Sequence, residues 1–478
     1  MHPPRVSSVR ALIVGAVIVA STVPAAAQTA PAQRDPDSFI QRQRALERRL
    51  RSEFEAELSA AQRAAFDWGG WYGLHVFMFD DGAESSRTFR RHDLRLWGRA
   101  SLENGAHDFY ARTRLSVLDF NSGDSYDGDD HDVEGPNLER GTYRFDLRRA
   151  VLADGGAWID SNIEVLAGRD LAHWGTGLVL SWPLDQIAVR GTVRDFELTG
   201  MFGRTVGSAE DFDLSRTANR MRRDFMGGQL THRGFERHEP FVYALWQRDR
   251  NDEEFGWPVR DLDYDSLYLA IGSTGEVAKG FRYVAEAAYE AGTSHTGRLL
   301  EPENEIDAWA LGLELEYLFA SKRRTRASVE YLFGSGDGDR LDSPTDTLGR
   351  RTPGSQDTSF VGFGYRNTGL SFAPRYSNLH LWRAGASCFP WPEHPRLRNL
   401  ELGADWLLYQ KHHASGAVSD PTADIQSGYL GWEMDYYANW RVDADFAWTA
   451  RFGAFFPGKA FSDRTTRTFL LVGMTWSF

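Results

Sequence analysis

Apolar and polar residues alternate along most of the chain after about residue 68. In the last stretch, 466–478, the apolar positions count back from Phe478 in steps of two, and the other face holds small or polar residues such as Thr475 and Ser477. Successive side chains of a strand point to opposite faces, so this stretch is predicted to be a strand with one apolar face. The same period recurs along the chain, which indicates an all-β protein.

Eighteen segments carry this alternation. They cover residues 69–80, 87–104, 106–120, 141–155, 159–170, 183–190, 193–205, 222–235, 238–249, 262–274, 279–291, 305–320, 323–335, 377–388, 397–411, 425–439, 441–454 and 466–478. Bacterial outer-membrane barrels have an even number of antiparallel strands of about 10 residues, joined alternately by long loops and short turns.

The connections follow that rule. Long connections come after odd-numbered strands, at 121–140, 206–221, 250–261, 336–376 and 455–465. Short ones come after even-numbered strands, with a moderately long exception at 389–396. The predicted fold is therefore a transmembrane antiparallel β-barrel of about eighteen strands, with both ends of the chain in the periplasm.

The chemistry of the two strand faces favours a membrane barrel over a soluble sandwich. Charges recur on one strict face of many strands, and the apolar faces are too many and too continuous for one sandwich core. The terminal Phe478, preceded by alternate aromatic residues, resembles the assembly signal of outer-membrane barrels. The expected location is the bacterial outer membrane, with outer-membrane lipid and the barrel assembly machinery as partners.

The N-terminal residues predict secretion. Arg5 and Arg10 precede and flank the apolar run 11–20, and the small residues of 23–27 form a cleavage site, so residues 1–27 read as a signal peptide. Residues 28–67 are expected to form a periplasmic helical extension, because apolar residues recur there every four positions between 46 and 58. The barrel is predicted to occupy residues 68–478.

Composition narrows the function. The chain has 478 residues, a net charge of −13 and a single cysteine, Cys388, which excludes a disulfide framework. No nucleic-acid partner is expected. Acidic residues concentrate in the loop 121–139, which is either a solvated acidic loop or a calcium site, since Ca²⁺ prefers carboxylate oxygens.

The chain offers no enzyme motif. It lacks G-x-S-x-G, H-E-x-x-H and the P-loop pattern, and His412 and His413 have no further metal-binding partner at a recognisable spacing. We therefore expect no catalytic residues, no metal site and no cofactor other than the calcium alternative at 121–139.

Arginine recurs on the polar strand face instead. By alternation the inward arginines are Arg95, Arg99, Arg112, Arg144, Arg148, Arg326 and Arg451, with Asp146, Asp195, Asp443 and Asp445 interleaved. By alternation, Arg169 lies on the same strand face as the apolar residues of its segment. An inward position would therefore require a bulge or a strand end. Such a set either holds a polycarboxylate weakly at many points or consists of arginine–aspartate pairs that fill the barrel.

The loop 336–376 is too aromatic to lie in water, because it contains F-V-G-F-G-Y at 360–365 and F-A-P-R-Y at 372–376. We expect it to fold into the lumen and narrow the pore.

Several motifs resemble the alginate export family of outer-membrane proteins. They are E-V-L-A-G-R at 164–169, E-Y-L-F-G-S-G-D at 330–337, R-Y-S-N-L at 375–379, and Y-L-G-W-E at 429–433 with F-F-P-G at 455–458. The resemblance implies an eighteen-stranded barrel in which arginines at a constriction clamp polymer carboxylates. The family motifs assign this role to Arg169, Arg375 and Arg451. Position in the strands assigns it to Arg95, Arg144 or Arg148, and position in the loop assigns it to Arg366.

The chain departs from this family at Asp170, where Gln is common, in the helical extension, and at Trp440, where two strands are expected to join without the family's long periplasmic turn. The resulting prediction is an outer-membrane channel for an anionic, uronate-containing polysaccharide such as alginate, with Arg95, Arg144, Arg148, Arg169, Arg366, Arg375, Arg451 and Asp195 as lumen residues. Periplasmic export proteins are further expected partners. The alternatives are a porin for small anionic solutes and a surface-binding or adhesive barrel whose lumen is shut.

Overall fold

A computed structural model describes residues 64–80, 82, 86–125, 128–207, 209, 221–250, 254–255, 260–261, 263–294, 304–341, 343–345 and 356–478. The predicted signal peptide, 1–27, and nearly all of the predicted helical extension, 28–67, lie outside these residues. Within the described part of the chain, no helix combines the length and the apolar character that a membrane crossing requires.

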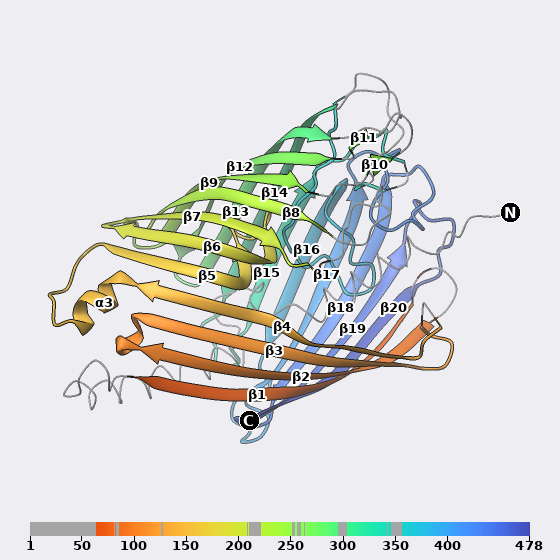
Figure 1. The fold of residues 1–478 in the computed structure, drawn as a ribbon. Helices are drawn as coiled ribbons and strands as arrows, with labels where there is room; N and C mark the ends of the chain where they lie inside the picture. Colours follow the sequence, from red (N-terminus) through yellow and green to blue (C-terminus); the bar gives the residue numbers. More distant parts are fainter. Residues whose placement is uncertain are drawn as a thin grey trace.

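Eighteen strands form one closed antiparallel sheet, as the alternation predicts (Figure 1). They are β1 (Ala65–Asp80), β2 (Ser86–Leu102), β3 (His107–Phe120), β4 (His131–Asp146), β5 (Asn162–His173), β6 (Ser181–Val193), β7 (Phe196–Thr205), β8 (Arg223–His232), β9 (His238–Asp249), β12 (Tyr264–Ala278), β13 (Phe281–Ser294), β14 (Asn304–Leu318), β15 (Arg326–Gly334), β16 (Leu379–Cys388), β17 (Leu400–Lys411), β18 (Tyr429–Arg441), β19 (Phe446–Pro457) and β20 (Arg467–Ser477). A separate two-stranded hairpin pairs β10 (Glu254–Phe255) with β11 (Arg260–Asp261).

The barrel closes between its first and last strands. β1 pairs with β20 from Trp71 and Ser477 to Phe79 and Phe469, and the backbone N–H of Gly70 donates to the carbonyl of Phe478 at 2.9 Å. Closure leaves no free sheet edge, which a lipid environment requires. We call the end of the barrel near Phe478 the periplasmic end and the other the extracellular end.

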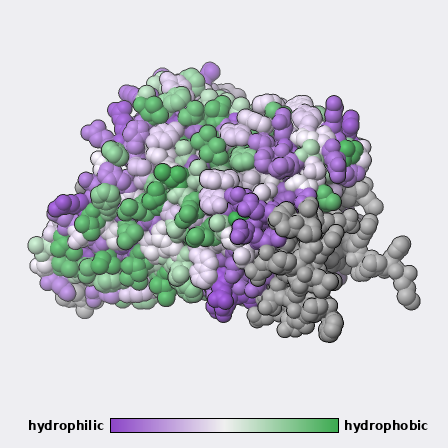
Figure 2. Space-filling view, turned by 90° about the horizontal axis from the view of Figure 1, so that it is seen from above, coloured by the Kyte–Doolittle hydropathy of each residue, from purple (hydrophilic) through white to green (hydrophobic). Residues whose placement is uncertain are grey.

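The outward side chains are apolar. On β12, Leu269 and Ile271 are 48% and 63% exposed, whereas the intervening Ala270 is buried. Figure 2 looks down on the wall that lies uppermost in Figure 1, and hydrophobic residues cover broad areas of it. The apolar face predicted for each strand is therefore the face that meets lipid.

Four predicted boundaries differ from those in the structure. The predicted strand 141–155 covers the end of β4 and a short helix. β4 begins at His131 and ends at Asp146. Asp146 caps the helix α3 (Leu147–Ala153) by accepting the backbone N–H of Arg149. A single-turn 3-10 helix, η3 (Glu103–Gly105), forms the turn before β3. β1 begins at Ala65, within the predicted helical extension. The turn after β18 spans residues 442–445, whereas the prediction placed the junction at Trp440.

A bulge in β18 reverses one predicted side chain. Gly431 has a φ of 132°, and the pairing with β17 shifts at Tyr409 and Gln410. Simple alternation along 425–439 would put Leu430 on the lipid face with Met434, but the bulge turns Leu430 inward, where it is fully buried. A β-bulge leaves no mark on hydrophobic alternation in one strand, so the sequence did not reveal it.

Candidate functional site

The described residues of the long loop between β15 and β16, 335–341, 343–345 and 356–378, lie inside the barrel, as predicted for 336–376. On one side, the backbone N–H of Val361 donates to the Glu290 carboxylate of β13 at 2.8 Å, and the hydroxyl of Tyr268 donates to the carbonyl of Val361. Glu290 and Tyr268 are fully buried. The loop is therefore fixed to the barrel wall from within.

Glu433 of β18 holds the same loop on another side of the barrel. Its carboxylate accepts the backbone N–H groups of Leu370, Ser371 and Phe372 at 2.7, 2.6 and 3.0 Å, and also the Tyr409 hydroxyl. Phe372 stacks on Phe455 of β19, with ring centroids 4.4 Å apart. The loop thus crosses the interior between two distant parts of the wall.

A second, shorter loop supports the first. Residues 174–180, between β5 and β6, run parallel to the long loop: Phe363 donates to the carbonyl of Val179 at 2.8 Å and accepts from the backbone N–H of Ser181 at 3.0 Å. The Tyr376 hydroxyl donates to the carbonyl of Leu178, and burial raises the pKa of Tyr376, so this donor keeps its proton. Together with inward side chains of the strands, the two loops form the apolar core of the barrel interior.

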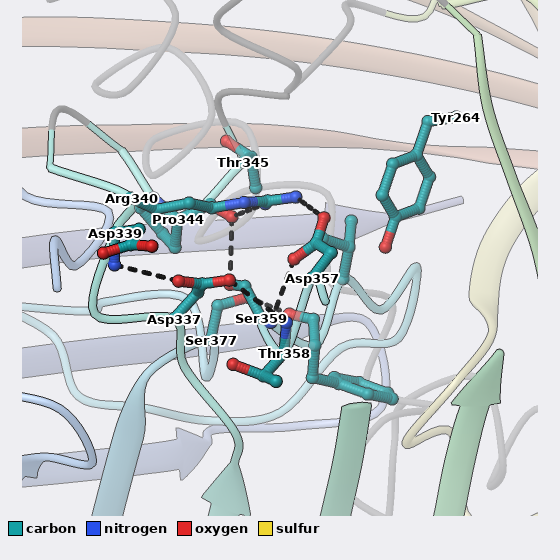
Figure 3. A network of polar contacts seen from close by, with 12 residues as sticks. Tyr264, Asp337, Asp339, Arg340, Pro344, Thr345, Asp357, Thr358, Ser359 and Ser377 are labelled. Atoms are coloured by element: carbon teal, nitrogen blue, oxygen red, sulfur yellow. Dashed lines mark hydrogen bonds and ion pairs between the residues drawn. The ribbon is translucent and has the colours of Figure 1, made fainter. Parts of the chain in front are cut away.

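A buried ion pair fixes the base of the long loop (Figure 3). The Arg340 guanidinium binds the Asp357 carboxylate and the carbonyl of Pro344, and both charged side chains are almost completely buried. Asp357 also exchanges backbone hydrogen bonds with Glu305 and Asp307 of β14, each at 2.8 Å. This network joins the loop to the wall at the extracellular end.

Seven arginines lie on the inward face of β2, β3 and β4. They are Arg91, Arg95, Arg99, Arg112, Arg114, Arg140 and Arg144. Their ion-pair partners are the carboxylates of Asp93, Asp108, Glu134, Glu139 and Asp170. Seven guanidinium groups share five carboxylates as ion-pair partners, so on this wall, which we call the basic wall, several carboxylates bind more than one arginine.

The predicted residues Arg95 and Arg144 belong to the basic wall. Arg95 binds Glu139 through Nε at 3.0 Å and lies over the ring of Trp71, and Arg144 binds Asp108 at 3.0 Å. Arg144 keeps 34% of its side chain exposed, whereas Arg95 keeps 11%. Arg144 is therefore better placed to meet a solute.

Sequence reasoning missed Arg114, Arg140 and Glu139 as parts of this wall. Arg140 binds Asp170 at 2.7 Å, and Glu139 binds Arg95 and Arg112. The pairing of β3 with β4 shifts twice near these residues. Glu139 and Arg140 are adjacent yet both reach the inward groups, which simple alternation excludes.

The opposite wall is richer in carboxylates. β3 and β14 are nine positions apart in the ring of eighteen strands, so β14 faces the basic wall. There Arg383 binds Glu330 at 2.6 Å and approaches Glu314 at 4.0 Å. The predicted inward Arg326 binds Glu316 and Glu401 at 3.6 and 3.4 Å. Arg383 lies in the predicted strand 377–388. Alternation along that strand could have identified Arg383 as an inward residue.

Arg366 and Arg451 differ from these arginines. Arg366, on the long loop, donates to the Thr176 hydroxyl, and Arg451 projects inward from β19 between the exposed Trp448 and Phe452. Neither makes an ion pair with any residue that the structure describes. Burial raises the pKa of Tyr365, and the charges of Arg451 and Arg383 partly offset that rise, which places both arginines near the loop.

Arg169 does not lie in the lumen. It shares its face of β5 with the exposed Ile163, and its guanidinium binds Asp185 of β6 at 2.8 Å, on the face that carries the exposed Ile187. β5 pairs with both neighbours without a register shift, so strand parity holds and the placement inferred from the family motif is wrong. Asp170 points to the other face and binds Arg140 rather than Arg169.

The remaining predicted residues are dispersed. Arg148 lies on α3 at the periplasmic end, over the ring of Trp158, and not on a strand. Asp195 lies exposed in the turn between β6 and β7. Asp443 and Asp445 lie in the turn after β18. These carboxylates were misplaced because the predicted strand boundaries were off by a few residues.

Arg375 lies in the long loop, beside a cavity of about 30 Å³ that Thr345, Val361 and Tyr376 also line. Its backbone N–H donates to the Ser419 hydroxyl at 2.8 Å. Arg375 is thus near the extracellular end of the interior, away from the basic wall.

The acidic loop is shorter than predicted, because β4 takes up residues from His131 onward. The Asp124 carboxylate accepts the backbone N–H of Thr88 at 2.8 Å, so it fixes the neighbouring hairpin. In the described part of the chain, no group of three or more His, Cys, Asp or Glu side chains is arranged to hold a metal ion.

Comparison with solved structures identifies the same architecture in other bacterial proteins. OccK8 (OprE) of Pseudomonas aeruginosa is 11% identical with a TM-score of 0.52, and the match covers 88% of this chain and 99% of that one. OccAB2 of Acinetobacter baumannii is 9% identical with a TM-score of 0.52 over the same shares. OccK5 (OpdH) of P. aeruginosa is 11% identical with a TM-score of 0.51, again over 88% and 99%. At these identities the likeness shows the fold alone.

No curated protein matches the chain. The family model described as alginate export, however, matches residues 192–473, which is more than half of the sequence and includes both β7–β19 and the long inward loop. The match and the closed eighteen-stranded barrel agree on an outer-membrane protein. The chain therefore belongs to the alginate export family and is an outer-membrane barrel of the channel-forming type.

Proposed function

We propose that this barrel passes an anionic, uronate-containing polysaccharide through its lumen, with arginines of the basic wall and of the long loop binding the carboxylates of the chain. The observation that carries the proposal is the set of seven arginines on β2, β3 and β4 that share five carboxylate partners, together with Arg366 and Arg451, which form no ion pair with a described residue. Membership of the alginate export family supports this choice of solute class.

The physical reason is the match between guanidinium and carboxylate. A guanidinium stays charged at every physiological pH and binds a carboxylate through two parallel N–H donors. A polymer that carries one carboxylate on each sugar is held by several such contacts at once, and each is weak because Asp108 or Glu139 competes for the same arginine. Weak, repeated binding permits movement along a channel.

Planar-bilayer recording of the purified protein tests the proposal. We expect single-channel currents that favour anions and that oligouronates of increasing length block in a concentration-dependent manner. A neutral oligosaccharide of equal length should block far less, because it lacks carboxylates. Equal block by both would show that size alone governs passage.

The same recording separates the two alternatives. A porin for small anionic solutes would favour anions but would show no length-dependent block by oligouronates. An adhesive barrel with a shut lumen would give no current at all, and replacing Arg144 and Arg375 with Ser would leave its ligand binding unchanged.

A further inference from the structure

Four arginines gather at the extracellular ends of three neighbouring strands. Arg204 lies near the end of β7, Arg222 directly precedes β8, and Arg248 and Arg250 lie at the end of β9 and just beyond it. Asp224 of β8 pairs in register with both Arg204 and Arg248, and the backbone N–H of Arg250 donates to the carbonyl of Arg222 at 2.8 Å. We call these four residues the outer arginine cluster.

The cluster faces outward, toward the membrane surroundings. Residues two positions apart in a strand lie on the same face of the sheet. In the direction of the periplasm, the next outward residues are Phe202, Met226 and Trp246, which are 50%, 49% and 39% exposed. The surface therefore changes from apolar to cationic within one step along three adjacent strands, which marks the extracellular boundary of the lipid-facing band.

Among the described residues, the four arginines outnumber the neighbouring outward carboxylates, which are Asp224, Asp185 in register with Arg204, and Asp265 beside Arg248. Asp224 is the carboxylate that binds the cluster, accepting from Arg204 at 2.6 and 3.1 Å and lying 3.7 Å from Nε of Arg250. Asp224 is only 15% exposed, whereas Arg204 and Arg250 are 58% and 49% exposed. Arg204 uses Nε and Nη2 on Asp224, and among the described residues its Nη1 donors meet no acceptor.

We propose that the outer arginine cluster binds the phosphate groups of outer-leaflet lipids. Acyl chains of such a lipid would lie against Phe202, Met226 and Trp246, which puts the headgroup at the height of the four arginines. Phosphate oxygens accept several guanidinium N–H groups at once, and Asp224 orients Arg204 without neutralising the cluster. Tryptophan favours this interfacial depth because its ring is apolar and its N–H is polar.

Native mass spectrometry of the detergent-solubilised full chain with diphosphoryl lipid A tests the proposal. We expect the double substitution Arg204→Gln with Arg250→Gln to weaken lipid A binding about tenfold, since charge-assisted hydrogen bonds are lost. The matched control is Arg194→Gln with Arg237→Gln, which removes the same charge from exposed turns at the periplasmic end and should leave binding unchanged. Retained mobility of unboiled samples on gels verifies that each variant is folded.

Two further probes identify the ligand. Phosphatidylcholine, which has acyl chains but no net charge, should bind the wild type weakly, and inorganic phosphate should compete only at far higher concentration than lipid A. The proposal is overturned if the Arg204/Arg250 variant binds lipid A as the wild type does, if phosphatidylcholine binds equally well, or if inorganic phosphate displaces lipid A at comparable concentration.

Discussion

Glu433 accepts the backbone N–H of Ser371 at 2.6 Å, and this contact ties a strand of the barrel wall to the loop that crosses its interior. The two residues are 62 positions apart in sequence. Because the same carboxylate also accepts the N–H groups of Leu370 and Phe372, Glu433 is the main attachment of the loop on this side.

Replacing Glu433 with Gln should loosen the loop and leave the barrel folded. The carboxamide NH₂ cannot accept a hydrogen bond, so at least one backbone donor loses its partner, at a cost of about 1–3 kcal/mol. We expect faster hydrogen exchange at residues 370–372 and noisier single-channel currents. Glu393→Gln, in an exposed turn, is the matched control, and identical exchange in both variants would show that Glu433 does not hold the loop.

The fold was predictable because every lipid-facing strand must repeat the same alternation. The eighteen predicted segments correspond to the eighteen strands of the sheet, since a one-residue register error would turn charges such as Glu314 or Glu330 toward lipid. What the alternation could not specify is where a strand bulges or ends. The bulges at Glu139 and Gly431 and the helix after Asp146 all escaped prediction.

The candidate site was only partly predictable, for a related reason. Strand parity placed Arg95, Arg144 and Arg451 correctly on the inward face, and it also indicated that Arg169 faces outward. The family motif suggested the opposite for Arg169, and the regular register of β5 decides in favour of parity. The interior loop contacts depend on residues far apart in sequence, which local patterns do not encode.

Arg366 and Arg451 should contribute most to anion selectivity. Neither is neutralised by an ion pair with a described residue, so each acts on a passing solute with its full charge. In the double Gln variant, each lost charge removes about 1 kcal/mol of attraction for a monovalent anion at a separation near 8 Å and an intermediate dielectric constant. For each charge, this loss lowers the local concentration of the anion roughly fivefold. The measurement is the reversal potential under a salt gradient.

A charge-matched control sharpens that experiment. The double substitution Arg148→Gln with Arg169→Gln also removes two positive charges, but from α3 and from the outer face of β5. We expect its reversal potential to equal that of the wild type. An equal shift in both double variants would indicate that net charge, and not position in the lumen, sets selectivity.

Breaking the Arg340–Asp357 pair should destabilise the base of the long loop. Arg340→Met leaves the fully buried Asp357 carboxylate without its main cation, at a cost of about 3–5 kcal/mol. The double substitution Arg340→Met with Asp357→Leu should recover part of that loss, because it removes both buried charges. Protease resistance and hydrogen exchange of residues 356–360 report the effect, and equal losses in the single and double variants would contradict it.

Acid should weaken the loop at His412. Nδ1 of His412 accepts the backbone N–H of Gly336 at 3.1 Å, where the loop leaves β15, and burial, followed by the nearby His413 and His380, lowers the pKa of His412 from its usual value near 6.5. A histidine whose pKa falls on folding stabilises the native state above the unfolded value, and that contribution disappears as the pH drops through the folded value.

We therefore expect the Gly336 N–H to lose exchange protection below about pH 6, after correction for the intrinsic rate. His412→Gln should show lower protection at neutral pH but little further dependence on acid, because Gln does not titrate. His394→Gln, in an exposed turn, should keep the wild-type pH profile. A wild-type profile that stays flat from pH 7.5 to about 5 would mean that the proton goes elsewhere and that His412 serves the loop only as a fixed acceptor.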